Sequence, residues 1–347
     1  MWVDCLAADL AAGKRLENKS DETEATYWGN PMYRILTASL WSATAPIGLT
    51  EELPTRTLGR TGQKVSILGL GGHHVGQVQD DSEAIRLVRA AIDMGVTFMD
   101  CAWEYHQGRA EMLLGRALQD GYRQQVFLMT KHHGRDRKTA MQQLEDSLRR
   151  FRTDVIDLWQ FHEIIYEDDP DMIFAPDGGI EAAEQARRQG KVRYIGFTGH
   201  KDPAIFRKML SYDYPWDTVQ MPVNVLDAHF RSFQREILPI LLERNIGAIA
   251  MKSMGSGHVL ESGVVGPKQA LRYAWSQPVS TVICGMTSRE QLEENVQAAR
   301  EFKPLSRQEE AELLEKARPV ARDGAFEPFK TTTQFDGIVG KQLHGLA

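Results

Sequence analysis

The feature that most constrains the fold of this chain is a regular alternation of short apolar runs with amphipathic segments. Eight apolar runs follow Leu53, and each ends near a Gly, Asp, Lys or His; they cover residues 65–71, 98–102, 126–131, 157–163, 194–200, 218–223, 247–253 and 281–286. Their spacing of ~25–35 residues is what parallel strands joined by crossover helices require. The pattern therefore predicts eight strand–helix units.

The segments between the runs carry the signals of helix starts and stops. Residues 81–95 place Ile85, Val88 and Ile92 on one face and end at Gly95, as an amphipathic helix does. Residues 179–191 end at Gly190, which is typical of a C-cap glycine. Ser288 stands three residues before Gln291, the spacing of a capping box.

Eight such units fit a closed (β/α)8 TIM barrel, an α/β fold, better than any other architecture. The alternative is a doubly wound parallel sheet, but its dinucleotide fingerprint is missing. After the first run the chain reads GLGGHHVG, with His74 where the third glycine of G-x-G-x-x-G would stand. The chain also lacks a Walker A sequence. We therefore predict the barrel.

The 347 residues divide into three parts by composition. Residues 1–52 are mostly polar and charged and are typical of a mobile N-terminal extension. Residues 53–302 form the predicted barrel, preceded by a β-hairpin that turns at Thr61-Gly62. Residues 303–347 form a predicted C-terminal helix and a tail that packs on the barrel.

Charge and cysteine usage narrow the class of protein. A net charge of -6 and a pI near 6.0 argue against nucleic acid as a partner. The three cysteines, Cys5, Cys101 and Cys284, form no C-x-x-C pair, which argues against a zinc or iron–sulfur site and favours a reducing compartment. No apolar run approaches the ~20 residues that span a bilayer. Residues 32–49 mimic a signal peptide but are interrupted by polar residues, so we expect a cytoplasmic protein.

Polar side chains stand at the ends of three consecutive predicted strands. Asp100 follows the second run, Lys131 ends the third, and His162 ends the fourth. Tyr105 lies in the loop after the second run. In (β/α)8 barrels the reactive groups lie at the carboxyl ends of the strands and in the loops that follow. We therefore expect these four side chains to meet at one opening of the barrel.

The four residue types together suit proton donation to a carbonyl oxygen. A phenol has a pKa near 10, and a nearby ammonium is expected to lower it. The ammonium needs a carboxylate partner to stay charged in a partly dry pocket, and an imidazole can orient the substrate oxygen. Taken singly, Asp100 is as well explained as a helix N-cap and Tyr105 as a rim aromatic. Their occurrence at consecutive strand ends favours an active site.

These residues and their surroundings resemble the aldo-keto reductase superfamily. The likeness runs from about Leu53 to Phe302 through the blocks GLGGHHVG, FMDCAWEY, GRAEMLLGRAL, FLMTKHHG, SLRRFRTDVIDLWQFHE, GKVRYIGFTGH and EQLEEN. The resemblance implies NAD(P)H-dependent reduction of a small-molecule aldehyde or ketone, with a tetrad of Asp100, Tyr105, Lys131 and His162 and Tyr105 as general acid. The sequence of this stretch is similar to that of a bacterial branch described as predicted oxidoreductases. Since no cysteine follows Cys284, the iron–sulfur cluster of some relatives is not expected.

The resemblance also implies a cofactor site. Thr198 and Gln220 would hold the nicotinamide amide, and Met251 would replace the aromatic that stacks on its ring. Gly199 and His200 depart from the family pattern. The loops after the seventh and eighth strands commonly bind phosphate in barrels. Pyrophosphate contacts are expected from Lys252, Ser253, Met254 and Gly255.

The adenine end would lie at the start of the last barrel helix, whose free N–H groups favour anions. The residues implied there are Gly285, Met286, Ser288, Arg289, Gln291, Glu294 and Asn295. Gln291 is equally well explained as part of a capping box. Arg289 could meet a 2′-phosphate, so NADP(H) is preferred and NAD(H) remains the alternative.

Several features of the sequence allow two interpretations. The paired histidines at 73–74 and 132–133 suggest a metal, but adjacent strand residues point to opposite faces, so we expect none. His74 and Trp103 are expected to line the substrate pocket. The tail at 317–337 either folds over the pocket or straps the outer helices. A cofactor-binding sensor or partner subunit with little turnover is the alternative function, and nothing in the sequence indicates an oligomeric state.

Overall fold

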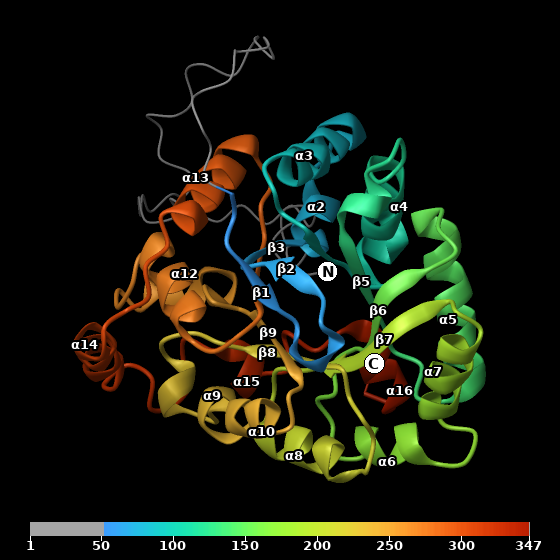
Figure 1. Ribbon diagram of the computed structural model, residues 1–347. Coiled ribbons are helices and arrows are strands. Elements are labelled where there is room, and N and C mark those ends of the chain that lie inside the picture. Colours follow the sequence, from blue (N-terminus) through green and yellow to red (C-terminus); the bar gives the residue numbers. More distant parts are fainter. Residues whose placement is uncertain (1–51, 347) are drawn as a thin grey trace, which may run out of the picture. The chain divides into compact units, whose positions relative to one another are not determined.

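The computed structural model describes residues 52–346. Eight parallel strands close into a barrel in the order β10-β3-β4-β5-β6-β7-β8-β9, with helices around it (Figure 1). The strands are β3 (Leu68–Gly71), β4 (Phe98–Asp100), β5 (Phe127–His132), β6 (Ile156–Phe161), β7 (Val192–Thr198), β8 (Thr218–Pro222), β9 (Gly247–Met251) and β10 (Thr281–Cys284). The predicted (β/α)8 barrel is therefore confirmed. The predicted extension lies outside the described residues apart from Glu52.

Helices follow most of the strands and continue beyond the last one. Those between strands are α2 (Gly72–Gln77), α3 (Asp81–Asp93), α4 (Arg109–Ala117), α5 (Arg137–Phe151), α6 (Asp169–Phe174), α7 (Gly179–Arg188), α8 (Pro203–Ser211), α9 (Phe233–Glu236), α10 (Leu238–Glu243), α11 (His258–Glu261) and α12 (Pro267–Ser276). After β10 come α13 (Arg289–Arg300), α14 (Arg307–Ala317), α15 (Pro328–Thr331) and α16 (Ile338–Leu343). None of the helices within residues 52–346 combines the length and hydrophobicity needed to cross a bilayer.

The first predicted run differs in one respect, because it contributes to two sheets. Val65 and Ser66 belong to β2 (Lys64–Ser66), and the barrel strand begins only at Leu68. The hydroxyl of Ser66 accepts from the backbone N–H of Thr97 at 2.9 Å and donates to the carbonyl of Leu68 at 2.6 Å. These side-chain bonds turn the chain between the two strands.

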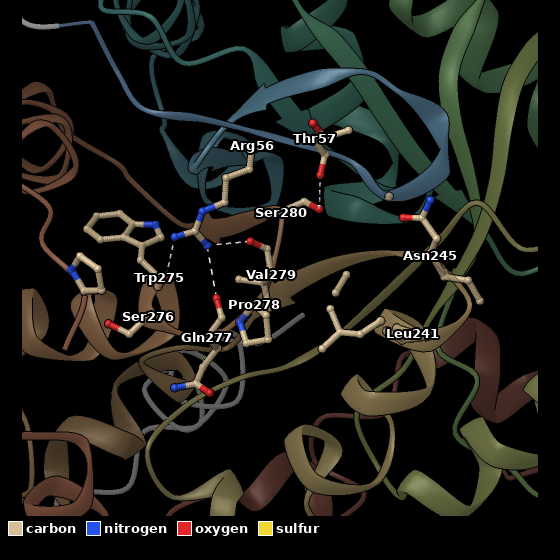
Figure 2. A pocket seen from close by; sticks show the side chains of 15 residues that line it. Arg56, Thr57, Leu241, Asn245, Trp275, Ser276, Gln277, Pro278, Val279 and Ser280 are labelled. Carbon is tan, nitrogen blue, oxygen red and sulfur yellow. Dashed lines mark hydrogen bonds between the residues drawn. The ribbon is translucent and has the colours of Figure 1, made fainter. Parts of the chain in front are cut away.

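The N-terminal hairpin pairs β1 (Thr55–Thr57) with β2 in antiparallel register and lies across the centre of the ring in Figure 1. Gly62, at the predicted turn, has a φ of 69°. The guanidinium of Arg56 donates to the carbonyls of Trp275 and Val279 at 2.6 and 2.7 Å (Figure 2). Because Val279 precedes β10, the hairpin closes the amino end of the barrel. A pocket of about 470 Å³ lies there, between the hairpin and this loop.

Apolar side chains fill the interior of the barrel next to the hairpin. Phe98 stacks on Phe127 with ring centroids 5.4 Å apart, and Met129, Leu158 and Ile249 complete the same buried cluster. Burial of this kind stabilises by about 25 cal/mol per Å² of apolar surface. The polar side chains that converge on the candidate site lie at the opposite, carboxyl ends of the strands.

Candidate active site

Asp100 and Lys131 form a buried ion pair between neighbouring strands. Asp100 ends β4 and Lys131 is the penultimate residue of β5, and their side chains are 5% and 1% exposed. The ammonium of Lys131 donates to a carboxylate oxygen of Asp100 and, at 2.7 Å, to the carbonyl of Cys101. Its third contact is the hydroxyl of Tyr105, 3.2 Å away. Because a buried charge needs several such partners, the Lys131 side chain is held in place.

Tyr105 reaches the ammonium because the loop after β4 turns sharply. It begins a 3-10 turn (Tyr105–Gly108) in which His106, Gln107 and Gly108 have φ values of 50°, 56° and 89°. The ring of His106 makes a 2.9 Å hydrogen bond to the carbonyl of His73. Non-glycine residues rarely adopt positive φ, and their clustering is typical of a turn held by its surroundings. This turn directs the phenol back towards Lys131.

The pKa of Tyr105 lies well above its usual value, because burial and the carboxylates of Asp100 and Glu104 disfavour the phenolate. The expectation that Lys131 would lower this pKa overall is therefore wrong. Burial and the carboxylates thus outweigh the opposing effect of the Lys131 ammonium on this pKa. The phenol stays protonated at neutral pH and is available as a proton donor.

His162 completes the group of four side chains that the sequence placed at one opening. It follows β6, and its backbone N–H donates to the carbonyl of His132 at 2.7 Å. Its ring lies 5.6 Å from the ring of Tyr105, at an angle of 76°. Burial, together with His133 and Lys131, holds the pKa of His162 well below its usual value. The imidazole is therefore neutral and can both donate and accept a hydrogen bond.

The residues expected to hold a nicotinamide amide lie beside this group. Gln220 donates through Nε2 to Asp100 at 2.7 Å, and Thr198 pairs with Gln220 in the register of β7 and β8. Met251 ends β9, with its sulfur 3.9 Å from the Thr198 hydroxyl. The Oε1 atom of Gln220 is buried and has no hydrogen-bond partner within residues 52–346. An unsatisfied buried acceptor of this kind suits the NH₂ group of a carboxamide.

The loop after β9 is a tight turn, in which the N–H of Gly255 donates to the carbonyl of Lys252 at 3.1 Å. Lys252 and Gly255 have φ values of 55° and 58°, Ser253 is buried, and Met254 packs on the core. The Lys252 ammonium lies 5.1 Å from the ring centroid of Phe329. Burial lowers the pKa of Lys252 to about 8. This loop combines a cation with a strained backbone, as anion sites often do.

At the start of α13, the side chains cap the helix. The Ser288 hydroxyl accepts from the N–H of Gln291 at 3.3 Å, and Gln291 Oε1 accepts from the N–H of Thr287 at 2.8 Å. The side chain of Gln291 is thus engaged in a cap, shifted by one residue from the expected box. Arg289 pairs with Glu293 at 2.7 Å on the exposed surface. Of the other residues implied there, Met286 is buried, Glu294 is exposed, and Asn295 donates to Cys284 Sγ at 3.4 Å.

The two histidines after β3 have different surroundings. The ring of His73 lies 5.2 Å from that of Tyr105 and perpendicular to it, and burial lowers the pKa of His73 to about 2. His74, which the sequence assigned to the pocket, lies against Gly285, where a Cβ atom would meet its Nδ1 at 2.0 Å. Both residues lie in helix α2 rather than in a strand, so strand alternation did not identify the one beside Tyr105.

Trp103, the other predicted pocket residue, contacts helix α5 instead of the four converging side chains. Its indole N–H donates to Asp146 at 3.2 Å. The guanidinium of Arg150 lies 5.2 Å from its ring centroid and donates to its carbonyl at 2.8 Å. These contacts anchor the start of the loop that carries Tyr105.

The C-terminal strap, residues 327–344, reaches the same end of the barrel. The carbonyl of Phe329 contacts His200 Nδ1 at 2.9 Å, and the N–H of Gly337 donates to Glu163 at 2.9 Å. Lys201 forms an ion pair with Asp336. His200 and Glu163 follow β7 and β6, so the strap lies over the carboxyl ends of these strands. Of the two alternatives for the tail, these contacts correspond to the one at the opening.

The strap is held by buried charges. The Lys330 ammonium donates to Asp227 at 2.6 Å and to Glu327 at 3.1 Å, and these side chains are almost entirely buried. Burial raises the pKa of Glu327 to about 7. Removing one partner from such a network leaves an uncompensated charge, which costs about 3–5 kcal/mol. The strap is thus a fixed part of the fold.

Comparison with known proteins identifies the family. The model of the Aldo/keto reductase family matches residues 67–269, more than half of the chain. The chain belongs to this family. Its members are nicotinamide-dependent oxidoreductases that act on small carbonyl compounds, and this general class holds for the present chain.

Individual relatives of this aldo/keto reductase are distant. Aldo-keto reductase YhdN of Bacillus subtilis (strain 168) is 29% identical over 215 residues, which cover 57% of this chain and 61% of YhdN. L-galactose dehydrogenase of Arabidopsis thaliana is 27% identical over 328 residues, which cover 83% and 98%. The solved holo form of aldo-keto reductase AKR11C1 from Bacillus halodurans has a TM-score of 0.64 at 26% identity and covers 78% of this chain and 97% of that chain.

Proposed function

We propose that this aldo/keto reductase reduces aldehydes or ketones to alcohols with NADP(H), and that Tyr105 is the general acid. The observation that carries the proposal is the 3.2 Å contact between the Tyr105 hydroxyl and the ammonium of Lys131, which is itself bound to Asp100. A phenol in this position can donate a proton and then bear a negative charge beside a fixed cation.

The roles of the side chains follow from these contacts. The nicotinamide, when bound, supplies the hydride that reduces the carbonyl carbon. Tyr105 donates its proton to the carbonyl oxygen, and the Lys131 ammonium stabilises the resulting phenolate. The high pKa of Tyr105 keeps the proton on the phenol until a strong base forms on the substrate. The neutral imidazole of His162, close to Tyr105, orients the substrate oxygen by a hydrogen bond.

The cofactor would be held along the carboxyl ends of β7 to β10. We assign Gln220 Oε1 and Thr198 to the carboxamide, because the former is an unsatisfied buried acceptor. The loop from Lys252 to Gly255 is assigned to the pyrophosphate. NADP(H) is preferred over NAD(H) because Arg289 lies in the first turn of α13. Its ion pair with Glu293 is exposed and is therefore weak enough to be exchanged for a 2′-phosphate.

The substrate class is a small carbonyl compound, or the corresponding alcohol in the reverse direction. The similarity to an L-galactose dehydrogenase over most of both chains makes sugars a class to include beside simple aldehydes. We propose the cytoplasm as the location, since Cys101 and Cys284 are free and a reducing compartment suits unpaired thiols.

The test compares Tyr105→Phe with the wild-type protein by NADPH absorbance over a panel of aldehydes, ketones and aldoses. We expect kcat to fall by about 10²- to 10⁴-fold, the usual contribution of a general acid, with NADPH binding retained. Tyr194→Phe is the matched control, because its hydroxyl contacts the carbonyl of Thr61 at the other end of the barrel. Wild-type rates in Tyr105→Phe would show that the acid is misassigned. Tight NADPH binding without turnover of any substrate would favour the sensor alternative.

A further inference from the structure

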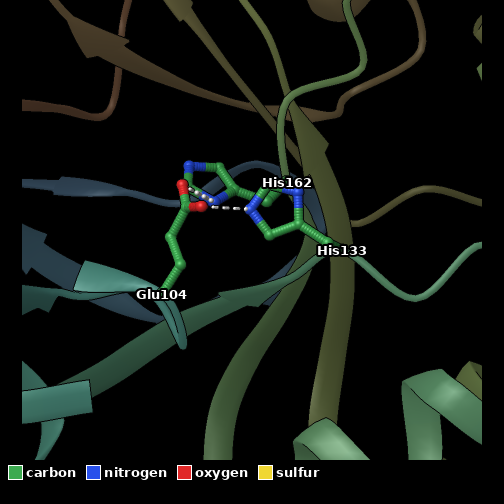
Figure 3. A group of neighbouring side chains, drawn as sticks. All are labelled: Glu104, His133 and His162. Atoms are coloured by element: carbon green, nitrogen blue, oxygen red, sulfur yellow. Dashed lines mark ion pairs between the residues drawn. The ribbon is translucent and has the colours of Figure 1, made fainter. Parts of the chain in front are cut away.

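A carboxylate and two imidazoles from three different loops converge beside the proposed acid (Figure 3). Glu104 lies in the loop after β4, His133 follows β5, and His162 follows β6. Glu104 Oε2 lies 3.1 Å from His133 Nε2, and Glu104 Oε1 lies 3.5 Å from His162 Nδ1. One atom from each residue fits within a group whose members are all within 4.8 Å of one another. The three side chains need to approach one another by a few tenths of an ångström to share one ion with bonds of about 2.0–2.2 Å.

These ring nitrogens are buried but unsatisfied. His133 is fully buried, and neither of its ring nitrogens has a hydrogen-bond partner in the part of the chain that is described. The same holds for His162 Nδ1. The short polar contacts of these nitrogens are those with the Glu104 carboxylate. Buried polar atoms without partners are rare in native proteins and frequently indicate a missing ion or water. The imidazole nitrogens and the carboxylate are therefore better placed to bind one ion between them than to hydrogen-bond to one another.

We propose that Glu104, His133 and His162 form a binding site for a divalent transition-metal ion of the zinc type. Zinc binds imidazole and carboxylate at about 2.0–2.2 Å in a tetrahedron, which puts neighbouring ligand atoms roughly 3.4 Å apart. The two contacts of Glu104 are close to this separation, but each uses a different carboxylate oxygen, so coordination through one oxygen requires a small rotation of the carboxylate. Three protein ligands leave a fourth position for water, as in open zinc sites. Two imidazoles disfavour Mg²⁺ and Ca²⁺, which prefer oxygen.

The charges around the cluster are compatible with a cation. A Cβ atom added to Gly337 would lie 2.4 Å from Glu163 Oε2 and 3.0 Å from Glu104 Oε2, so a second carboxylate approaches the cluster under the strap. The nearby cation Lys131 is already paired with Asp100. Glu163 therefore adds negative potential at the site.

The adjacent histidines behave as strand geometry demands, which explains why the sequence did not indicate this site. His132 points to the other side of β5 and stacks on Trp159, with ring centroids 3.8 Å apart. His133 points into the opening and meets His162, with centroids 4.8 Å apart. The metal ligands therefore come from different strands, and neither adjacent pair acts as a unit.

The test is isothermal titration of the metal-stripped full chain with ZnCl₂, beside MgCl₂. We expect one Zn²⁺ site per chain and no Mg²⁺ site. His133→Gln and Glu104→Gln should each weaken the Zn²⁺ affinity at least 100-fold while their circular dichroism spectra stay native. Zn²⁺ should also raise the Tm of the wild-type protein and not that of His133→Gln, because an ion that binds the folded state stabilises it.

The matched control is His258→Gln, which removes the exposed His258–Glu261 pair, with Nδ1 and Oε2 3.0 Å apart. Zn²⁺ binding that survives both His133→Gln and Glu104→Gln, or that disappears in His258→Gln, would overturn the proposal. Absence of any Zn²⁺ site in the wild-type chain would overturn it as well. The binding step does not depend on the proposed reductase activity, since no substrate or nicotinamide enters the measurement.

Discussion

Each end of the barrel contains a buried aspartate bound to cations, and the two use their bonds differently. Asp157, near the amino end of β6, accepts from Arg123 and Arg193 at 2.8 and 2.7 Å and from the N–H of Leu128 at 2.9 Å. Asp100, at the carboxyl end of β4, accepts from Lys131 and Gln220. Both carboxylates are about equally buried, with side chains 6% and 5% exposed.

The two aspartates differ in the further contacts that their hydrogen-bond partners make. Around Asp157 the bonds join two arginines to strand backbone and fix the packing of three neighbouring segments. Around Asp100 the partners carry further polar atoms, since Lys131 contacts the Tyr105 hydroxyl and Gln220 retains an unsatisfied oxygen. The same residue type at the same burial thus stabilises the fold at one end and presents groups to a ligand at the other.

The largest expected effects come from neutralising each aspartate in turn. Asp100→Asn should lower kcat by about 100-fold or more, because Lys131 loses its partner and no longer holds the phenol and its developing charge. Asp157→Asn should lower the free energy of unfolding by about 1–3 kcal/mol, because its partners lose a charged acceptor while the two arginines stay partly exposed to solvent. Its kcat, measured well below its Tm, should stay close to wild type. Carbonyl reduction and thermal unfolding of both variants check this.

This pair of variants can break the comparison in two ways. If Asp157→Asn lost activity while still folded, the amino end would be coupled to the chemistry. If Asp100→Asn lost only stability, the carboxylate would be structural, and the proposed role of Lys131 would fail with it.

The same contrast explains how far the sequence predicted the fold. The eight runs were visible because buried parallel strands need continuous apolar residues and the crossover helices impose a regular spacing. The boundary at Ser66 was missed because a side-chain bond to Thr97 decides it. That contact joins Ser66 to a residue that precedes β4, 31 positions away, and leaves no periodic trace in the sequence.

The site was predictable only where strand ends determine it. Asp100, Lys131 and His162 converge because parallel strands end at one face. Tyr105 depends on a turn with positive φ, which the sequence did not reveal. His73 and Glu104 were not selected as site residues, since helix α2 and the loop after β4 place them beside Tyr105 and His162. Of the two interpretations of Gln291, the structure shows a cap through its bond to Thr287, and the cofactor contact stays a prediction.

The two ends of the barrel are also closed by different segments, the hairpin and the strap. Glycine substitutions in these segments should have smaller effects on activity than the substitution of Asp100. A Cβ atom at Gly59, whose φ is 50°, would lie 2.2 Å from the backbone nitrogen of Gly247. At Gly337 the three nearest atoms would be carboxylate oxygens of Glu163 and Glu104. We expect Gly337→Ala to cost about 1–3 kcal/mol and to raise the KM of the carbonyl substrate, because the strap shifts. Gly59→Ala should be more destabilising without a change in KM.

Gly340→Ala is the matched control for the strap. It lies in α16, three residues from Gly337, and its added Cβ atom would be no closer than 3.6 Å to any neighbour. Alanine there should raise stability by about 0.5–1 kcal/mol, since it favours the helix. Gly337→Ala should therefore lower the Tm and raise KM, whereas Gly340→Ala should raise the Tm without the same change in KM. Equal shifts in the two variants would mean that the strap does not pack on the carboxylates.

The smallest expected effect is a pH dependence of NADPH binding, which should arise at only one end of the barrel. At the amino end the hydrogen bond that Arg193 donates to Asp157 raises the pKa of Arg193, so that cation keeps its proton. At the opening, burial lowers the pKa of Lys252 to about 8. Below pH 8 the ammonium is charged and attracts the cofactor phosphates; above it, the charge is lost. The Kd of NADPH should therefore rise by up to about tenfold between pH 7 and pH 9.

Fluorescence titration of NADPH across this range, using the tryptophans, measures the effect. Lys252→Met should bind more weakly at pH 7 and lose the pH dependence, because the titrating group is gone. Lys201→Met is the control, since Lys201 pairs with Asp336 of the strap and its removal leaves Lys252 in place. A pH dependence that persisted in Lys252→Met would assign the titration to another group at the opening. A Kd of NADPH that does not change with pH in the wild type would mean that Lys252 does not contact the phosphates. The difference in charged groups between the two ends of the barrel would then depend on Asp100 and Lys131 alone.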